Sequence, residues 1–228
     1  MTAWLAKPWR DLLDGMDAVL NGKARNLGMV MAGLLVGWWL YVPVHELSHA
    51  AACWLSGGEV TRLEIDSIYG GGLLAAVFPW VVAGSEYAGR LSGFDTKGSD
   101  LRYLLTDLGP FLWCPFGLAL LLHSARGRRP FVWGAALPWS FAPFLSLPGD
   151  AYEMGSILLT RLPTFESFAS VVRGDDAMAI LPAARLAGAT LAWSLAAAVG
   201  LAWALLWYGG SRTLARRWLD AAKAQPTG

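Results

Sequence analysis

The residues best suited to chemistry form the short motif His45-Glu46-Leu47-Ser48-His49, which has the pattern HExxH. On a helix, side chains four positions apart share a face, so His45 and His49 can present two imidazoles to one metal ion. Glu46 then lies beside the metal, where its carboxylate can take a proton from a water that the metal binds. Zinc suits this pattern, because a catalytic zinc site has three protein ligands and one open position.

The composition is that of an integral membrane protein. Hydrophobic residues make up 55% of the 228 positions, charged residues only 15%, and the mean hydropathy is +0.42. Soluble domains carry about 25% charged residues, so soluble, disordered and disulfide-scaffold classes are excluded. The net charge of +1 gives no electrostatic reason to bind nucleic acid, and we expect no such partner. We expect a multi-pass protein of the cell (inner) membrane, in contact with the lipid bilayer.

The apolar stretches predict an all-α polytopic membrane protein with about four transmembrane helices. A short membrane-associated β segment is expected after the first helix, because residues 59–66 alternate in polarity. Residues 67–85 are uncharged, but the glycines at 70–72 leave too short an apolar run, which favours a re-entrant or interfacial segment over a spanning one. The four predicted spans are residues 26–44, with the helix continuing to about 56, and then residues 103–122, 131–147 and 186–208.

Three parts are expected along the chain: an N-terminal amphipathic interfacial segment (1–26), a single membrane-embedded domain (27–210) and a basic C-terminal tail (211–228). In the first part, apolar residues recur at helical spacing, which is typical of a helix in the membrane interface. A helix packed on the protein's own loops fits the same pattern. The apolar positions are Leu5, Trp9, Leu12, Leu13, Met16 and Leu20.

The Lys and Arg residues predict which ends of the helices are cytoplasmic. The N-terminal region holds four, the loop at 126–129 three and the tail after residue 208 four. With four spans, these three groups fall on one face, which the positive-inside rule makes cytoplasmic. The HExxH end of the first span would then lie on the opposite face.

The run HELSHAAACWLSGGEVTRLEI, at residues 45–65, resembles the first membrane helix and following strand of the site-2 protease family of intramembrane zinc metalloproteases. In that family a membrane-dipping β segment follows HExxH, and two further helices lead to a motif whose Asp is the third zinc ligand. The order of elements is similar over roughly residues 27–160. The resemblance implies a Zn²⁺-dependent endopeptidase that hydrolyses peptide bonds of membrane-associated protein or peptide substrates.

The resemblance also implies a third metal ligand, which the family carries as Asp-Gly after a Leu-Pro stretch. Here the order is Leu147-Pro148-Gly149-Asp150, so Asp150 is the best candidate and Glu153 the reserve. Pro-Gly-Asp is also an ordinary turn signal with Asp as a helix N-cap. If residues 67–85 do not cross the membrane, two crossings return Asp150 to the face that holds the histidines.

In the expected mechanism Glu46 activates the zinc-bound water and then passes the proton to the leaving amine. The strand at residues 59–66 could accept an extended substrate by β-addition. Asp107, just before Gly109-Pro110, is expected to be a helix cap or a water-exposed acid rather than a partner of the site.

Several alternatives stay open at this point. A zinc-binding but non-proteolytic membrane protein, acting as a sensor or scaffold, is the main rival, and a transporter or scaffold with incidental histidines is the second. The family opens its zinc site toward the cytoplasm, whereas the Lys and Arg count places the motif on the other face. The membrane face of the site, the substrate and the oligomeric state are not determined by the sequence.

Overall fold

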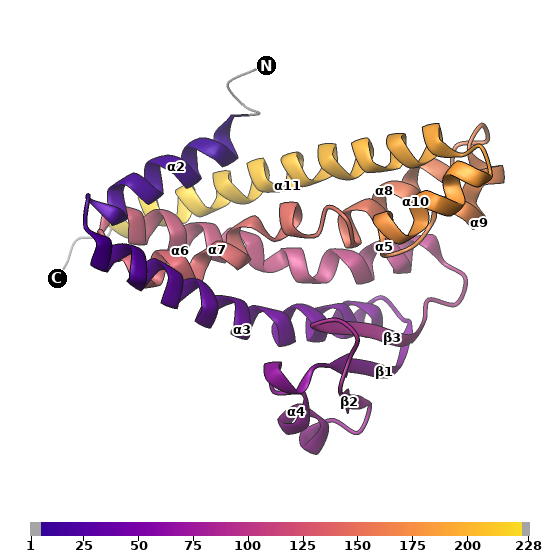
Figure 1. The fold of residues 1–228 in the computed structure, drawn as a ribbon, viewed down its shortest axis with the longest axis horizontal. Coiled ribbons are helices and arrows are strands. Elements are labelled where there is room, and N and C mark those ends of the chain that lie inside the picture. The colour runs from indigo at the N-terminus through magenta and orange to yellow at the C-terminus, as the bar shows by residue number, and fades with distance from the viewer. Residues whose placement is uncertain (1–5, 225–228) are drawn as a thin grey trace. The chain divides into compact units, whose positions relative to one another are not determined.

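The computed structural model describes residues 6–224 and is mostly helical, with one small sheet (Figure 1). This agrees with the predicted all-α polytopic class. The elements follow in the order α2 (Lys7–Leu20), α3 (Ala24–Leu55), β1 (Glu59–Ile65), η1 (Ser67–Tyr69), α4 (Gly71–Val77), β2 (Val81–Ala83), β3 (Gly89–Asp95), α5 (Asp100–Leu108), η2 (Gly109–Trp113), α6 (Cys114–Arg126), α7 (Pro130–Leu145), α8 (Asp150–Thr160), η3 (Glu166–Phe168), α9 (Ala169–Val172), α10 (Ala177–Leu186) and α11 (Thr190–Ala224).

The chain divides into two compact units. Unit 1 comprises residues 6–42, 111–142 and 205–224, and unit 2 comprises residues 43–110 and 143–204. Helices α3, α7 and α11 contribute residues to both units. The HExxH motif and Asp150 both fall in unit 2.

Three helical stretches are long and apolar enough to cross a membrane: Ala24–Leu55, Asp100–Arg126 and Thr190–Lys223. They include three of the four predicted spans. The fourth prediction corresponds to α7, which has 16 residues. At 1.5 Å per residue α7 is about 24 Å long, short of the roughly 30 Å hydrocarbon core. Within residues 6–224, three helical stretches thus reach spanning length, against the about four predicted, and α7 is the shorter fourth.

In unit 1, helix α2 is held by a buried ion pair. The Asp11 carboxylate accepts hydrogen bonds from the Arg212 guanidinium and from the Tyr208 hydroxyl, the latter at 3.0 Å. The helix thus packs on other helices of unit 1 rather than on loops, yet Trp9 and Leu13 remain 66% and 55% exposed. An apolar side of α2 still faces outward, as an interfacial helix requires. Leu5 lies outside the described residues.

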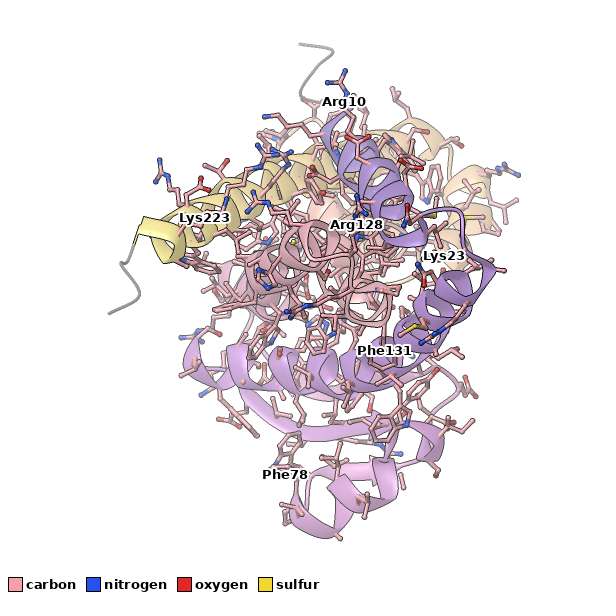
Figure 2. All side chains as sticks on the ribbon, turned by 90° about the vertical axis from the view of Figure 1, so that its left-hand side faces the viewer. Arg10, Lys23, Phe78, Arg128, Phe131 and Lys223 are labelled. Carbon is pink, nitrogen blue, oxygen red and sulfur yellow. The ribbon has the colours of Figure 1, made fainter. Side chains whose placement is uncertain are left out.

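The three basic regions of the sequence all lie in unit 1. Figure 2 shows Lys23, Arg128 and Lys223, one from each region, on the side of this unit that faces the viewer. Each of the three basic regions counted for the positive-inside rule therefore has a residue on this side of unit 1.

In unit 2, three strands form a sheet in the order β2-β1-β3. The strand predicted at 59–66 is β1, which pairs in parallel with β2 and antiparallel with β3. Leu63, Ile65 and Val81 form the buried core beneath the sheet. Residues 67–85 do not cross as one helix, because α4 has only seven residues and the chain then returns to β1 as β2.

The helices of unit 2 approach one another closely at glycines. A Cβ atom on Gly155 of α8 would overlap the carbonyl oxygen of Ala196 on α11, and one on Gly200 would overlap that of Ala151. Small residues let helix backbones pack at short distance where the surroundings are apolar. This pair of glycines therefore sets the position of α8, the helix that begins at Asp150.

We expect Gly155→Leu to destabilise the protein, because the larger side chain must push α8 away from α11. Overpacking of this kind costs about 1–3 kcal/mol or more. The measurement is the thermal unfolding midpoint in detergent, which should fall. Gly210→Leu is the matched control on α11, since nothing lies within 4 Å of a Cβ there. Equal midpoints for the two variants would contradict the role given to Gly155.

Candidate metal centre

Three side chains of unit 2 meet at one point. His45 and His49 lie one turn apart on α3, and Asp150 is the first residue of α8. The Nε2 atoms of the two histidines are 3.1 Å apart. The Asp150 carboxylate lies 3.2 Å from Nε2 of His45 and 3.6 Å from Nε2 of His49. Among residues 6–224 this is the one group of three such side chains whose ligand atoms could hold a metal ion.

The spacing of these atoms fits a tetrahedral ion. With bonds of about 2.0–2.1 Å, the ligand atoms of a tetrahedral site lie about 3.3 Å apart. The two Nε2 atoms are 3.1 Å apart, and the nearest carboxylate oxygens, Oδ2 to His45 and Oδ1 to His49, lie at 3.2 and 3.6 Å. One ligand atom from each of the three side chains lies within 4.8 Å of the others, so the side chains supply two nitrogens and a carboxylate that could hold a metal ion.

The tautomer of His49 also fits a metal ligand. Its Nδ1 lies 2.9 Å from the carbonyl oxygen of Thr106 in a buried contact. A carbonyl only accepts, so Nδ1 carries a proton and Nε2 is the ring atom that faces His45 and Asp150. Two imidazole nitrogens and a carboxylate this close together need a shared proton or a bound metal ion between them. A hydrogen bond on the second ring nitrogen is the usual support of a histidine ligand.

Pro110 explains why the Thr106 carbonyl is available. In a regular helix this oxygen would accept from the N–H of residue 110, but proline has none. The carbonyl instead accepts from the N–H of Gly109 and from His49. Gly109 is small enough to let η2 pass directly against Ser48 on α3, where a Cβ would overlap the backbone oxygen. The Gly109-Pro110 pair therefore brings α5 close to α3, the helix that carries His45 and His49.

Asp150 lies in the first turn of α8, where the helix dipole favours a carboxylate. The N-cap is Gly149 and no side chain caps this end, so the alternative of Asp150 as an N-cap is not what the structure has. Burial by itself would raise the pKa of Asp150, but the two imidazoles outweigh burial and hold the pKa well below its ordinary value.

Glu153, the reserve candidate, is not in the three-residue group. Its Oε1 accepts a hydrogen bond from the Tyr103 hydroxyl at 2.8 Å. Burial raises the pKa of Glu153 to about 7, although the Tyr103 hydroxyl acts in the opposite direction. Asp107 is only 4% exposed and one of its carboxylate oxygens has no hydrogen-bond partner in the described chain. The expectation that Asp107 is a cap or a water-exposed acid is therefore wrong.

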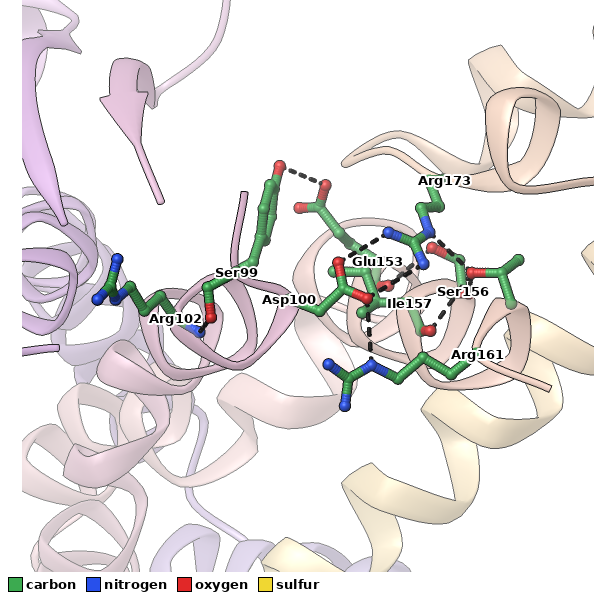
Figure 3. Close-up of polar contacts among 10 residues, drawn as sticks. Ser99, Asp100, Arg102, Glu153, Ser156, Ile157, Arg161 and Arg173 are labelled. Carbon is green, nitrogen blue, oxygen red and sulfur yellow. Dashed lines mark hydrogen bonds and ion pairs between the residues drawn. The ribbon is translucent and has the colours of Figure 1, made fainter. Parts of the chain in front are cut away.

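Ion pairs hold the start of α5 and the end of α8, the two helices that carry Asp107 and Glu153. Figure 3 shows Arg161 and Arg173 converging on Asp100, the first residue of α5. Arg173 donates to both carboxylate oxygens, at 2.9 and 3.3 Å, and Arg161 donates at 3.1 Å. Arg173 also donates to the Thr160 hydroxyl at the end of α8, at 2.7 Å. Helices α5 and α8 are thus tied together at the end remote from Asp150.

Glu46 lines a pocket of about 380 Å³ together with His45, His49 and Asp150. Strand β3 forms a wall of this pocket, and Gly89 lies so close that a Cβ would be 2.5 Å from Cγ of Glu46. The strand at 59–66, which was expected to accept the substrate, is the central strand β1 and pairs on both sides at Glu64 and Ile65. The edge strand beside the pocket is β3.

The described chain is that of a membrane protein, with apolar helices long enough to span a bilayer. It also carries a His-His-Asp cluster that could hold a metal ion, beside a glutamate. Residues 27–77 match the model of the Peptidase M50B-like family. The matched region includes the HExxH motif, β1 and α4, and ends before Asp150. It supports a site-2 protease-type family and points to a membrane protease. No curated protein and no solved structure matches the chain.

Sequence reasoning missed the groups that surround the ligands. The Thr106 carbonyl could have been found, because a proline four residues later always frees a helical carbonyl. The approach of β3 to Glu46 and the pairing of Tyr103 with Glu153 leave no local signal, since both join segments far apart in the chain.

We expect Asp150→Ala to lose most of the bound metal, because two imidazoles remain where three ligands are needed. Glu153→Ala should keep it, since Glu153 lies outside the cluster. Elemental mass spectrometry of detergent-purified protein gives metal per chain for both variants and the wild type. Metal retained by the Asp150 variant and lost from the Glu153 variant would move the third ligand to Glu153.

We expect Pro110→Ala to weaken metal binding by about tenfold, because a new N–H competes with His49 for the Thr106 carbonyl; loss of such ligand support costs 10–100-fold. The affinity is measured by competition with a chelator. Pro115→Ala is the control, because Pro115 lies in the first turn of α6, where a backbone N–H has no helical partner. An unchanged affinity for Pro110→Ala would remove its assigned role.

Proposed function

We propose that the protein is an intramembrane zinc-dependent endopeptidase that hydrolyses peptide bonds of membrane-associated protein substrates. The observation that carries the proposal is the His45, His49 and Asp150 cluster with Glu46 in the same pocket. The match of residues 27–77 to a peptidase family supports the same reaction class. We also propose that the chain is a multi-pass protein of the cell membrane, which the three spanning-length helices support.

Zinc is the proposed metal because two imidazole nitrogens and one carboxylate oxygen are its common catalytic ligand set. A zinc ion held by these residues would supply a Lewis acid for the scissile carbonyl and would lower the pKa of a bound water to about 7. His45, His49 and Asp150 would supply the three protein ligands of a catalytic zinc site, which keeps one further position for water or substrate.

Glu46 is the proposed general base and acid. Its position on α3, one residue after His45, places its carboxylate beside the cluster and not in it. Glu46 would take a proton from the attacking water and return it to the leaving amine. Gly89 confines the Glu46 side chain from the opposite side, which limits the rotamers that it can adopt.

Strand β3 is the proposed docking edge for the substrate. A membrane helix has its backbone hydrogen bonds satisfied internally, so it must unwind before its peptide bonds can be attacked. An edge strand supplies backbone donors and acceptors to an extended segment. Because β3 lines the pocket and touches Glu46, a segment paired with this edge would run past the general base.

The test is Glu46→Gln, which keeps the size of the side chain and removes its ability to take a proton. We expect cleavage of an internally quenched apolar peptide in detergent micelles to fall at least a hundredfold, as for loss of a general base, while metal content stays the same. Metal in a wild type that cleaves no peptide would instead favour the non-proteolytic alternative. Equal cleavage by variant and wild type would contradict the role of Glu46.

A further inference from the structure

Two buried carboxylates lie in the pocket beside the metal ligands and have no part in the proposed reaction. Asp107 comes from α5 and Glu153 from α8, and both line the pocket. They are only 4% and 6% exposed. We call this pair the acidic subsite.

The acidic subsite lacks the hydrogen-bond donors that its carboxylates require. Oδ2 of Asp107 is buried and has no partner in the described chain, whereas Glu153 has the Tyr103 hydroxyl as a donor to one oxygen. A carboxylate offers about four acceptor positions, and leaving them unfilled in a buried site is costly. The unpartnered oxygen of Asp107 therefore points to a ligand that donates hydrogen bonds.

The other charges of the pocket also favour a cation. Six carboxylates line it and Arg90 supplies the one guanidinium, which pairs with Asp175 at 3.3 Å. The acidic side chains that line the pocket therefore outnumber its one arginine. Asp107 and Glu153 do not form a second metal-ligand group within residues 6–224, which favours an organic cation over a second metal ion.

The walls of the pocket suit a long side chain with a charged end. Phe94 packs edge-on against Tyr103 at 5.2 Å between ring centroids, and Leu91 and Leu145 also line the pocket. Lys and Arg commonly lay their aliphatic stems along apolar surface while the charged head meets polar groups. The pocket combines such a surface with the acidic subsite.

We propose that Asp107 and Glu153 bind the ammonium or guanidinium group of a Lys or Arg side chain close to the scissile bond, so that the enzyme selects basic residues there. This inference rests on the proposed endopeptidase function and specifies its substrate class. A neutral residue at that position leaves the carboxylates buried without a partner, which is the situation in which polar pockets discriminate most strongly.

The test uses internally quenched peptides that are acetylated and amidated at their ends, so that no terminal charge contributes. One apolar sequence carries Lys, norleucine, Arg or citrulline at each position in turn. The zinc-loaded wild type should cleave the Lys and Arg peptides with a kcat/KM at least about tenfold above that of their neutral isosteres at one position. Comparable values at every position would overturn the proposal.

Variants of the subsite separate recognition from catalysis. Asp107→Asn and Glu153→Gln should each bring the Lys-to-norleucine ratio toward one, mainly through KM, while zinc content and cleavage of the norleucine peptide are kept. Glu153→Gln retains an acceptor for the Tyr103 hydroxyl, so this variant provides the same measurement of the ratio if Asp107→Asn does not fold. Glu166→Gln, which removes an exposed carboxylate outside the pocket, is the charge control and should keep the ratio. A ratio unchanged in both subsite variants would overturn the assignment.

A binding measurement distinguishes failure of this inference from failure of the proposed function. Fluorescence anisotropy with zinc-loaded Glu46→Gln protein compares a labelled Lys peptide with its norleucine counterpart, without any need for cleavage. Tighter binding of the Lys peptide that is lost in Glu46→Gln/Asp107→Asn supports the subsite even if the wild type cleaves nothing. Equal binding of both peptides overturns the subsite even if the wild type is an active protease.

Discussion

The main constraint on unit 2 is that two imidazoles and a carboxylate lie within 3.6 Å of one another in a largely buried site. Burying a carboxylate and two imidazoles is expensive unless they are paired with one another or with a cation. A shared proton or a metal ion among the three groups meets this requirement. The rest of the unit supplies the geometry: α3 spaces the histidines by one turn, α5 orients one of them, and α8 delivers Asp150.

Much of this arrangement could be predicted because it is encoded locally. The HExxH spacing places two histidines on one helical face whatever surrounds them, and alternating polarity identified β1. In both cases a short stretch of sequence carries the physical signal, and its period matches that of the helix or strand. Asp150 was instead predicted from the resemblance of residues 147–150 to a family motif, with which the order of the elements agrees.

What could not be predicted depends on contacts between distant segments. Asp107 looks like a cap because it precedes Gly-Pro, and only packing of α5 against α3 and α8 buries it. Strand β3 is short and rich in small and polar residues, so its role as a pocket wall follows from pairing with β1. The apolar run of α7 has the composition of a span, but the turn after Leu145 ends the helix too early.

The buried ion pair in unit 1 has a consequence for the order in which the chain is made. Asp11 and Arg212 are 201 residues apart, so the partner of Asp11 does not yet exist when α2 leaves the ribosome. At about 5–20 residues per second, some 10–40 s of synthesis separate the two side chains. The buried ion pair of Asp11 therefore cannot form before Arg212 has been made, and closure of unit 1 comes after the synthesis of α11 up to this residue.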